Sequence, residues 1–318
     1  MAKQNEKVDR ARLAEVVDEI VSRMEVIERF SQAADHLDDV ADLKVDRFGI
    51  AVVTHDGHVM KGGDADEPFP IQSISKMFAL SLALRAFGDD VWERVGREPS
   101  GDPFNSMVDL ERMQGIPRNP FINTGALVIC DMLLGIGKKS GVPPTVRALI
   151  SEKLGNEKFG EDRSIILDDG KGSGFSNRAI AYMLKGFDNL EHDVEKVMKL
   201  YVEQCAVELT CAQLAKAGHY LVHDGVDGVQ EDARDEAMLA RRVNSLMITC
   251  GQYDGSGDFA FRVGMPAKSG VSGAILAVAP DRASVAVWSP TLDENGNSLL
   301  GTLALELLSE KMGWSVFG

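Results

Sequence analysis

Exported and membrane-spanning proteins carry sequence features that this chain lacks. No run of apolar residues reaches the roughly 20 that a membrane-spanning helix needs. Residues 1–12 are dense in charge and no apolar segment follows them, so we expect no secretory signal. The cysteines form no C-x-x-C pair, and there are only four of them: Cys130, Cys205, Cys211 and Cys250. We therefore expect a cytoplasmic protein whose thiols are reduced and mostly buried.

Positive charge is also scarce. The chain has 34 Lys and Arg residues against 49 Asp and Glu residues, which gives a formal net charge of −15. Such a field repels the phosphates of nucleic acids and the headgroups of anionic lipids. We therefore expect no nucleic-acid partner and no membrane binding, and a small-molecule substrate is favoured instead.

Hydrophobic periodicity separates β-rich ends from a helical middle. Helical spacing of apolar residues predicts helices over residues 13–24, 74–87 and 298–312. Short β-rich runs on either side of turn residues predict two hairpins, over residues 46–60 and 274–288. Helix-type periods, interrupted by loops with Pro and Gly, fill residues 91–247.

These elements predict an α+β fold with one antiparallel sheet built from both ends of the chain. Helices would flank the sheet, and a helical lobe would be inserted between its two halves. We expect a single catalytic domain, with a sheet lobe over about residues 1–72 and 248–318 and a helical lobe over about residues 73–247. A pocket between the two lobes is the natural place for a site.

Ser73-Ile74-Ser75-Lys76 is the first segment that indicates chemistry. Residues three apart share a helix face, so the Ser73 hydroxyl and the Lys76 amine can meet at the start of the predicted helix. A lysine in a partly dry pocket loses affinity for its proton and can act as the base for a serine nucleophile. The motif alone is more often an N-capping serine followed by a solvated lysine, so it needs a second element.

That second element is Lys268-Ser269-Gly270, which comes just before the strand predicted to start at Ala274. An S-x-x-K motif followed much later by a K-[ST]-G triplet is the pairing of β-lactamases and penicillin-binding proteins. There the triplet lines one wall of the cleft, where Gly270 would let a substrate approach closely and Lys268 would add positive potential. Together the two motifs predict an acyl-transfer site.

Longer segments around these motifs closely resemble the serine-dependent glutaminase family. They are residues 69–76 (FPIQSISK), 103–106 (PFNS), 118–125 (RNPFINTG), 253–261 (YDGSGDFAF), 264–271 (GMPAKSGV) and 289–297 (SPTLDENGN). The resemblance runs from about residue 10 to the C-terminus. It implies a serine β-lactamase-like fold and hydrolysis of L-glutamine to L-glutamate and ammonia, with no metal or organic cofactor, by a homodimer or homotetramer.

The resemblance also implies roles for individual residues. Ser73 is the expected nucleophile, Lys76 its proton acceptor, and Tyr253 the phenol that passes a proton to the leaving nitrogen. The main-chain N–H groups of Ser73 and Val271 are expected to form the oxyanion hole. The expected substrate-binding residues are Gln72, Asn123, Asn177, Tyr201 and Val271.

Two positions depart from the family pattern. His36 stands where the family has a tyrosine that contacts substrate, and it is either a shorter hydrogen-bond donor or a plain surface residue. Gly170, seven residues before Asn177, stands where the family has the glutamate that pairs with the substrate ammonium. Asp169 is one position away and one methylene shorter, so it can substitute only if the loop shifts. Without a carboxylate, recognition of a free amino group loses about 1.5–3 kcal/mol.

Three alternatives to a glutaminase stay open. Because of the two departures, a glutaminase-fold amidohydrolase that acts on a different small carboxamide is the first alternative. A penicillin-recognising cell-wall enzyme shares both motifs, but its substrate lies outside the membrane. A non-catalytic ligand-binding protein is disfavoured because it has no need of Ser73, Lys76, Tyr253 and Lys268 together.

Overall fold

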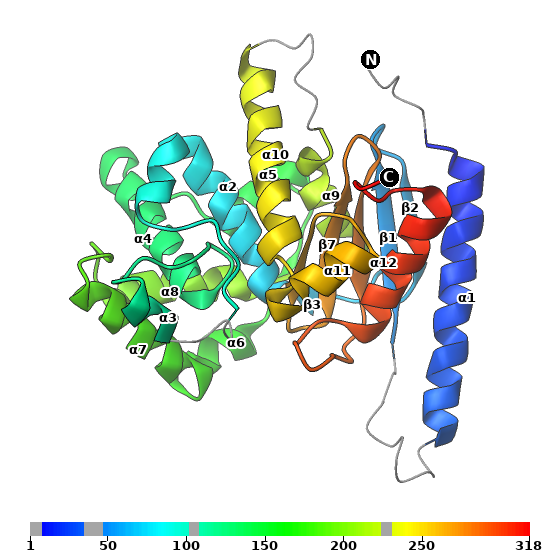
Figure 1. Cartoon of the computed structure of the whole chain (residues 1–318), viewed down its shortest axis with the longest axis horizontal. Coiled ribbons are helices and arrows are strands. Elements are labelled where there is room, and N and C mark those ends of the chain that lie inside the picture. Colours follow the sequence, from blue (N-terminus) through cyan, green and yellow to red (C-terminus); the bar gives the residue numbers. More distant parts are fainter. Residues whose placement is uncertain (1–7, 35–46, 102–107, 224–230) are drawn as a thin grey trace.

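The computed structural model describes residues 8–34, 47–101, 108–223 and 231–318. A central antiparallel sheet separates terminal helices on one side from a larger helical lobe on the other (Figure 1). His36 and residues 103–106, which the sequence analysis singled out, lie outside the described residues.

Five strands form the central sheet in the order β2-β1-β8-β7-β6, and all neighbouring pairs are antiparallel. The two predicted hairpins are present, and they join where β1 pairs with β8, with Ala51 opposite Ala286. The predicted α+β fold, with one sheet built from both chain ends, is confirmed. The strands are β1 (Gly49–Thr54), β2 (Val59–Gly63), β6 (Ala267–Gly270), β7 (Ala274–Ala279) and β8 (Ala283–Trp288).

The terminal helices cover one face of this sheet. Helix α1 (Arg10–Ala34) and helix α12 (Leu299–Met312) lie side by side there, at the right of Figure 1, and the short helix α11 (Ser256–Arg262) packs near them. Both predicted terminal helices are confirmed. Alternate strand residues such as Val52 and Val285 bury against these helices in one hydrophobic cluster.

The other face of the sheet is continuous with the core of the helical lobe. Helix α9 (Cys211–Gly218) packs on β1 and β8, and helix α2 (Ser75–Phe87) links this layer to helix α4 (Asn123–Ser140). One hydrophobic cluster runs from Ala51 in the sheet to α4. This continuity supports our proposal of a single catalytic domain. Helix α9 belongs by sequence to the predicted helical lobe, about residues 73–247, yet it packs on the sheet.

The remaining elements complete the helical lobe and its border with the sheet. The helices are α3 (Val108–Arg112), α5 (Val146–Lys153), α6 (Arg163–Leu167), α7 (Ser173–Gly186), α8 (Val194–Cys205) and α10 (Glu231–Cys250). A small second sheet consists of β3 (Phe69–Pro70), β5 (Val207–Leu209) and β4 (Gly160–Glu161). The 3-10 turns are η1 (Gln72–Ile74), η2 (Gly88–Glu93), η3 (Asp168–Gly170), η4 (His219–Leu221) and η5 (Tyr253–Gly255). In the described ranges no helix has the length and apolar character to cross a membrane.

Candidate active site

The small sheet holds the segment that leads to Ser73. Strand β3 pairs with β5, and Phe69 stacks on the ring of Trp288 from β8 with 5.6 Å between the centroids. The Ile71 N–H then donates to the Val207 carbonyl at 2.8 Å. Gln72 follows with a φ of 42°, a left-handed conformation that costs a non-glycine residue about 1–3 kcal/mol. The anchored chain therefore forces a tight turn directly before the serine.

A cavity of about 360 Å³ opens beside Ser73, between the helical lobe and the end of β6. Seven of the residues predicted from the sequence line it: Gln72, Ser73, Asn123, Asp169, Asn177, Tyr201 and Val271. They come from segments up to about 200 positions apart in the chain, so the fold has brought a dispersed set of polar groups to one place. Other lining residues, such as Ser164 and Cys205, could not be predicted from any motif in the sequence.

Lys76 lies behind the cavity wall, one turn of helix after Ser73. Its side chain is 1% exposed, and its Nζ donates to the Phe121 carbonyl at 3.2 Å and to Asn123 Oδ1 at 2.6 Å. Neither acceptor carries a charge, so burial dominates and lowers the pKa of Lys76 to about 8. About a tenth to a fifth of this amine is therefore neutral near physiological pH, far more than for a lysine in water.

Asn123 connects Lys76 to the cavity. Its Oδ1 also accepts from the Tyr201 hydroxyl at 3.2 Å, and its Nδ2 donates to Asn177 Oδ1 at 3.0 Å. These bonds fix the orientation of the amide, because the oxygen faces two donors and the nitrogen faces an acceptor. Burial raises the pKa of Tyr201 well above its ordinary value, so this hydroxyl stays a neutral donor.

Tyr253 is the third group at the serine. It has a φ of 51°, another left-handed conformation in a non-glycine residue. Burial raises its pKa to about 12, although hydrogen bonds with the hydroxyls of Ser73 and Ser269 act in the opposite direction. The phenol therefore holds its proton while in contact with both serines.

Lys268 lies over the ring of Tyr253. It is fully buried, its Nζ donates to the carbonyls of Gly251 at 3.0 Å and Ser269 at 2.7 Å, and it lies 4.5 Å from the centroid of the Tyr253 ring. Burial lowers its pKa well below the ordinary value, and the positive charge of Lys76 lowers it further. Protonation of one lysine therefore disfavours protonation of the other, and the two titrations are coupled.

The end of β6 forms the wall opposite the helical lobe. Val271 lines the cavity, and directly before it Gly270 lies so close to the Ser73 segment that a Cβ atom would come within 2.8 Å of the Ile71 carbonyl oxygen. Only glycine fits between two main chains at this distance. The close approach brings the main chain of Val271 to the same cavity as that of Ser73.

The substitution Gly270→Ala tests this contact. We expect kcat to fall by about 10²–10³-fold, the loss typical of removing one oxyanion-hole donor, because the added methyl group must displace the main chain at Val271. Steady-state kinetics on glutamine measures the effect. The matched control is Gly186→Ala at the end of α7, where a Cβ meets nothing within 4 Å. Equal activity of the two variants would contradict a catalytic role for this main-chain contact.

Asp169 lines the cavity, and its carboxylate is paired with the guanidinium of Arg178. Arg178 donates to both of its oxygens, at 3.2 Å from Nη1 and 2.7 Å from Nη2, and also binds Glu195 at 3.0 Å. The hydrogen bonds that Arg178 donates to Glu195 and then to Asp169 raise the pKa of Arg178, which therefore stays charged. This group of two carboxylates and one guanidinium keeps one net negative charge. Spacing in the sequence gave no sign that Arg178 or Glu195 belongs here.

Comparison with known proteins identifies the family to which this chain belongs. Residues 31–317 match the family described as Glutaminase. The chain belongs to the glutaminase family. The resemblance noted in the sequence is thereby confirmed.

Similar glutaminases span almost the whole chain. A glutaminase of Methylobacterium radiotolerans is 48% identical over 312 residues, which cover 96% of this chain and 99% of that protein. A glutaminase of Sinorhizobium fredii is 50% identical over 293 residues, covering 90% and 91%.

Solved glutaminase structures share the fold. A Bacillus glutaminase in 4.3 M NaCl superposes with a TM-score of 0.78 at 31% identity, covering 96% of this chain and 99% of that one. A Bacillus subtilis glutaminase in covalent complex with 5-oxo-L-norleucine, formed by reaction with 6-diazo-5-oxo-L-norleucine, has a TM-score of 0.75 at 29% identity, covering 95% and 99%.

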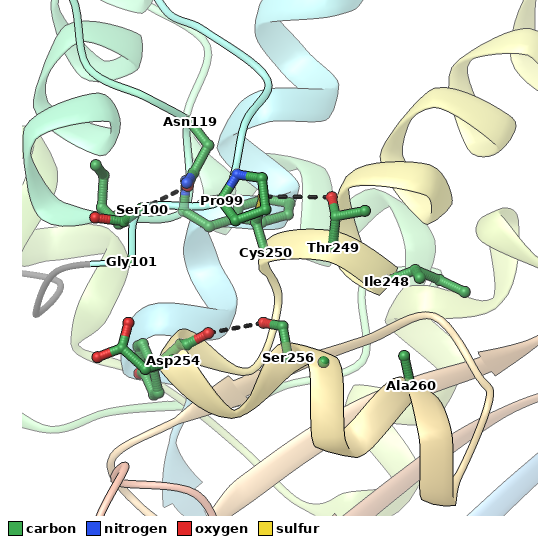
Figure 2. A pocket seen from close by; sticks show the side chains of 14 residues that line it. Pro99, Ser100, Gly101, Asn119, Ile248, Thr249, Cys250, Asp254, Ser256 and Ala260 are labelled. Atoms are coloured by element: carbon green, nitrogen blue, oxygen red, sulfur yellow. Dashed lines mark hydrogen bonds between the residues drawn. The ribbon is translucent and has the colours of Figure 1, made fainter. Parts of the chain in front are cut away.

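A larger cavity of about 640 Å³, shown in Figure 2, also has Tyr253 in its lining in this glutaminase. The segment around Pro99 and Ser100 forms one wall, and the turn and helix with Asp254 and Ser256 form the other. Ser73 does not line it. The Ser256 hydroxyl donates to the Tyr253 carbonyl at 2.8 Å, so this wall holds the Tyr253 loop in place.

Proposed function

We propose that the protein hydrolyses L-glutamine to L-glutamate and ammonia through an acyl-enzyme on Ser73. One observation carries the proposal: Ser73 borders the cavity, interacts with the Tyr253 phenol, and has the fully buried amine of Lys76 one helical turn away. The proposed chemistry uses side chains and main-chain groups alone, with no metal or organic cofactor.

Lys76 is the proposed base. A neutral amine has two N–H groups, and the Phe121 carbonyl and Asn123 Oδ1 accept both of them. The lone pair is then left for the proton of Ser73 as the serine oxygen attacks the carboxamide carbon. Burial favours this role, because it lowers the pKa of Lys76 to about 8 and keeps neutral amine available.

The later steps use Tyr253 and the main chain. The N–H groups of Ser73 and Val271 stabilise the oxyanion of the tetrahedral intermediate. Tyr253, with its proton retained, donates to the leaving nitrogen and is reprotonated from Lys76, so that the carbon–nitrogen bond breaks and ammonia departs. Water then attacks the acyl-enzyme and releases glutamate, with Lys76 as base again.

The polar cavity wall is the proposed substrate site. Gln72, Asn123, Asn177 and Tyr201 offer amides and a hydroxyl that suit the substrate carboxylate and carboxamide. For the ammonium group we propose Asp169, because its cluster with Arg178 and Glu195 keeps a net negative charge. A contact from His36, outside the described residues, stays a prediction.

The substitution Asp169→Asn tests the ammonium site. Loss of a charge-assisted hydrogen bond of about 1.5–3 kcal/mol raises KM for glutamine by about 10–100-fold. N-acetylglutamine has no ammonium group, so its KM is expected to change little in the variant. Asp168→Asn is the matched control, because Asp168 borders the same cavity but is two-thirds exposed and paired with Lys171. An effect of the same size on both substrates would show that Asp169 acts only through the structure.

A different small carboxamide is the second candidate substrate. It is favoured by Gly170, which cannot supply a carboxylate, and by the bonds that tie Asp169 to Arg178. Rates of ammonia release from glutamine, asparagine and N-acetylglutamine separate the two candidates. A kcat/KM at least about tenfold higher for glutamine supports the glutaminase, and a preference for the blocked or shorter amide supports the alternative.

We further propose that the enzyme acts in the cytoplasm as a homo-oligomer. The four cysteines are buried free thiols, which suits a reducing compartment. Phe175 and Tyr182 lie seven positions apart on α7, and both are mostly exposed, as is Leu167 nearby in the sequence. Such an apolar patch on one helix face is typical of a subunit contact.

A further inference from the structure

The loop between β8 and α12 passes next to the Tyr253 turn, but it lines neither the cavity at Ser73 nor the larger cavity. Its tip is Gly296, which has a φ of 86°. A Cβ atom added there would lie 4.0 Å from Cε2 of the Tyr253 ring and 3.6 Å from Cγ1 of Val271. The loop therefore approaches two residues of the proposed reaction from outside both cavities.

The backbone of Tyr253 needs support from its surroundings. Its φ of 51° is sparsely populated by non-glycine residues and persists only where neighbouring contacts hold it. Bonds within the turn fix its shape: the Gln252 N–H donates to Ser256 Oγ at 3.0 Å, and the Ser256 hydroxyl donates to the Tyr253 carbonyl at 2.8 Å. They cannot fix where the turn lies relative to Ser73, because that takes bonds from other segments.

Bonds from β6 and from the loop anchor the turn. On the β6 side, the Gly251 carbonyl accepts from the Ser269 N–H at 3.1 Å. On the loop side, the carbonyl of Gln252, directly before Tyr253, accepts from Asn297 Nδ2 at 3.1 Å, across 45 positions of the chain. The Asn297 side chain is buried, at 3% exposure, so water cannot readily replace this bond.

Asp293 holds Asn297 in place. Its Oδ1 accepts from the main-chain N–H groups of Asn295 and Asn297, both at 2.9 Å. The Asp293 N–H donates to the Asn297 carbonyl at 2.8 Å, and the Asp293 carbonyl accepts from the Gly296 N–H at 3.0 Å. These four bonds close the loop on itself, so the amide of Asn297 is already oriented towards the Tyr253 turn.

We propose that Asn297 is a positioning residue for the proton transfer to the leaving nitrogen. Through the Gln252 carbonyl it holds the Tyr253 phenol at Ser73, and Asp293 acts through Asn297. The inference rests on the proposed function. It gives a part in the reaction to residues 289–297, one of the segments that resemble the glutaminase family.

The substitution Asn297→Leu tests the proposal, because leucine has the same branched shape but no donor for the Gln252 carbonyl. We expect kcat on glutamine to fall by about 10–100-fold, as misplacement of a catalytic group does, with KM nearly unchanged. Ammonia needs a proton in order to leave, whereas the alkoxide of glutamate γ-methyl ester depends on one much less. We therefore expect kcat/KM on the ester to fall only a few-fold. Steady-state formation of glutamate from both substrates is the measurement.

Asn244→Leu is the matched control. Asn244 lies on α10, is 4% exposed, and donates from Nδ2 to the Leu221 carbonyl at 2.9 Å. The variant therefore loses the same kind of buried bond, at a place that lines neither cavity. We expect it to keep wild-type kinetics on both substrates.

Substitutions at Asp293 decide the test if Asn297→Leu fails to fold. Asp293 is only partly buried, so its replacement is better tolerated. Asp293→Ala removes the acceptor that holds Asn297 and is expected to lower turnover of glutamine more than that of the ester. Asp293→Asn keeps an acceptor oxygen and is expected to restore kcat to within a few-fold of wild type.

Other results would overturn the proposal. Equal losses of kcat/KM on glutamine and on the ester would show that Asn297 acts only through the overall structure. Wild-type kinetics in both Asn297→Leu and Asp293→Ala would show that the Tyr253 turn needs no support from the loop. A wild-type enzyme that turns over neither substrate would refute the proposed function itself, and the inference with it.

Discussion

Replacement of Ser73 by alanine is expected to lower kcat on glutamine by about 10⁴–10⁶-fold. The variant loses the atom that forms the acyl-enzyme, and only substrate binding and the oxyanion hole remain to accelerate attack by water. The measurement is ammonia release under saturating glutamine. Thermal unfolding of the variant is expected to match wild type, because Ser73 lies at the cavity and not in the hydrophobic core.

Ser75→Ala is the matched control for this experiment. Its hydroxyl is buried and faces the Cys205 thiol at 3.8 Å, so its loss is expected to leave kcat within a few-fold of wild type. The second readout is covalent: 6-diazo-5-oxo-L-norleucine is expected to modify the peptide that carries Ser73 in wild type and in the control. Retained turnover in Ser73→Ala, or a label on another peptide, would contradict the proposed nucleophile.

Replacement of Lys76 by methionine is expected to lower kcat by about 10²–10⁴-fold, the range of a general base. The pH dependence of kcat/KM in the wild-type enzyme gives a second test, because only the neutral amine of Lys76 accepts a proton. With the pKa of Lys76 lowered to about 8, kcat/KM is expected to rise with pH up to that value and then level off. The variant is expected to lack this rise. A wild-type profile that is flat around pH 8 would argue against Lys76 as the base.

Lys76→Met is also expected to change how the free energy of unfolding depends on pH. The pKa of Lys76 is about 8 in the folded chain against 10.5 in the unfolded one, so the unfolded state binds more protons between these values. Wild-type stability therefore rises with pH across this window, and below it burial of the charge costs up to about 3 kcal/mol. Lys76→Met has no amine to titrate in this window, so its stability is expected to rise less with pH than that of wild type. Lys199→Met, at an exposed lysine on α8, serves as the control.

The sequence predicted well those features that depend on local pattern. Both hairpins and the terminal helices form, because turn residues and apolar spacing act over a few positions. The motif spacing also placed Ser73 and Lys76 within one helical turn. The left-handed backbone at Gln72 gave no such signal, since the anchor that forces it is the pairing of residue 71 with Val207, far along the chain.

Partners distant in the sequence account for what was missed. An amphipathic pattern shows which face of α9 is apolar but not that this face meets the sheet. In the same way, spacing near Asn177 showed that a carboxylate was displaced, but not that Arg178 and Glu195 would bind the nearest one. The resemblance to glutaminases supplied the candidate site residues across these gaps, and six of them line one cavity.

The two buried lysines have a consequence for calorimetry. At about pH 9 the amine of Lys76 is mostly neutral when enclosed by the fold and mostly charged in the open chain, and burial lowers the pKa of Lys268 in the same direction. Each folding event at this pH therefore releases up to two protons, which the buffer takes up. The enthalpy of unfolding then includes the heat of ionisation of the buffer, and values from Tris and from borate at that pH differ although the protein is the same.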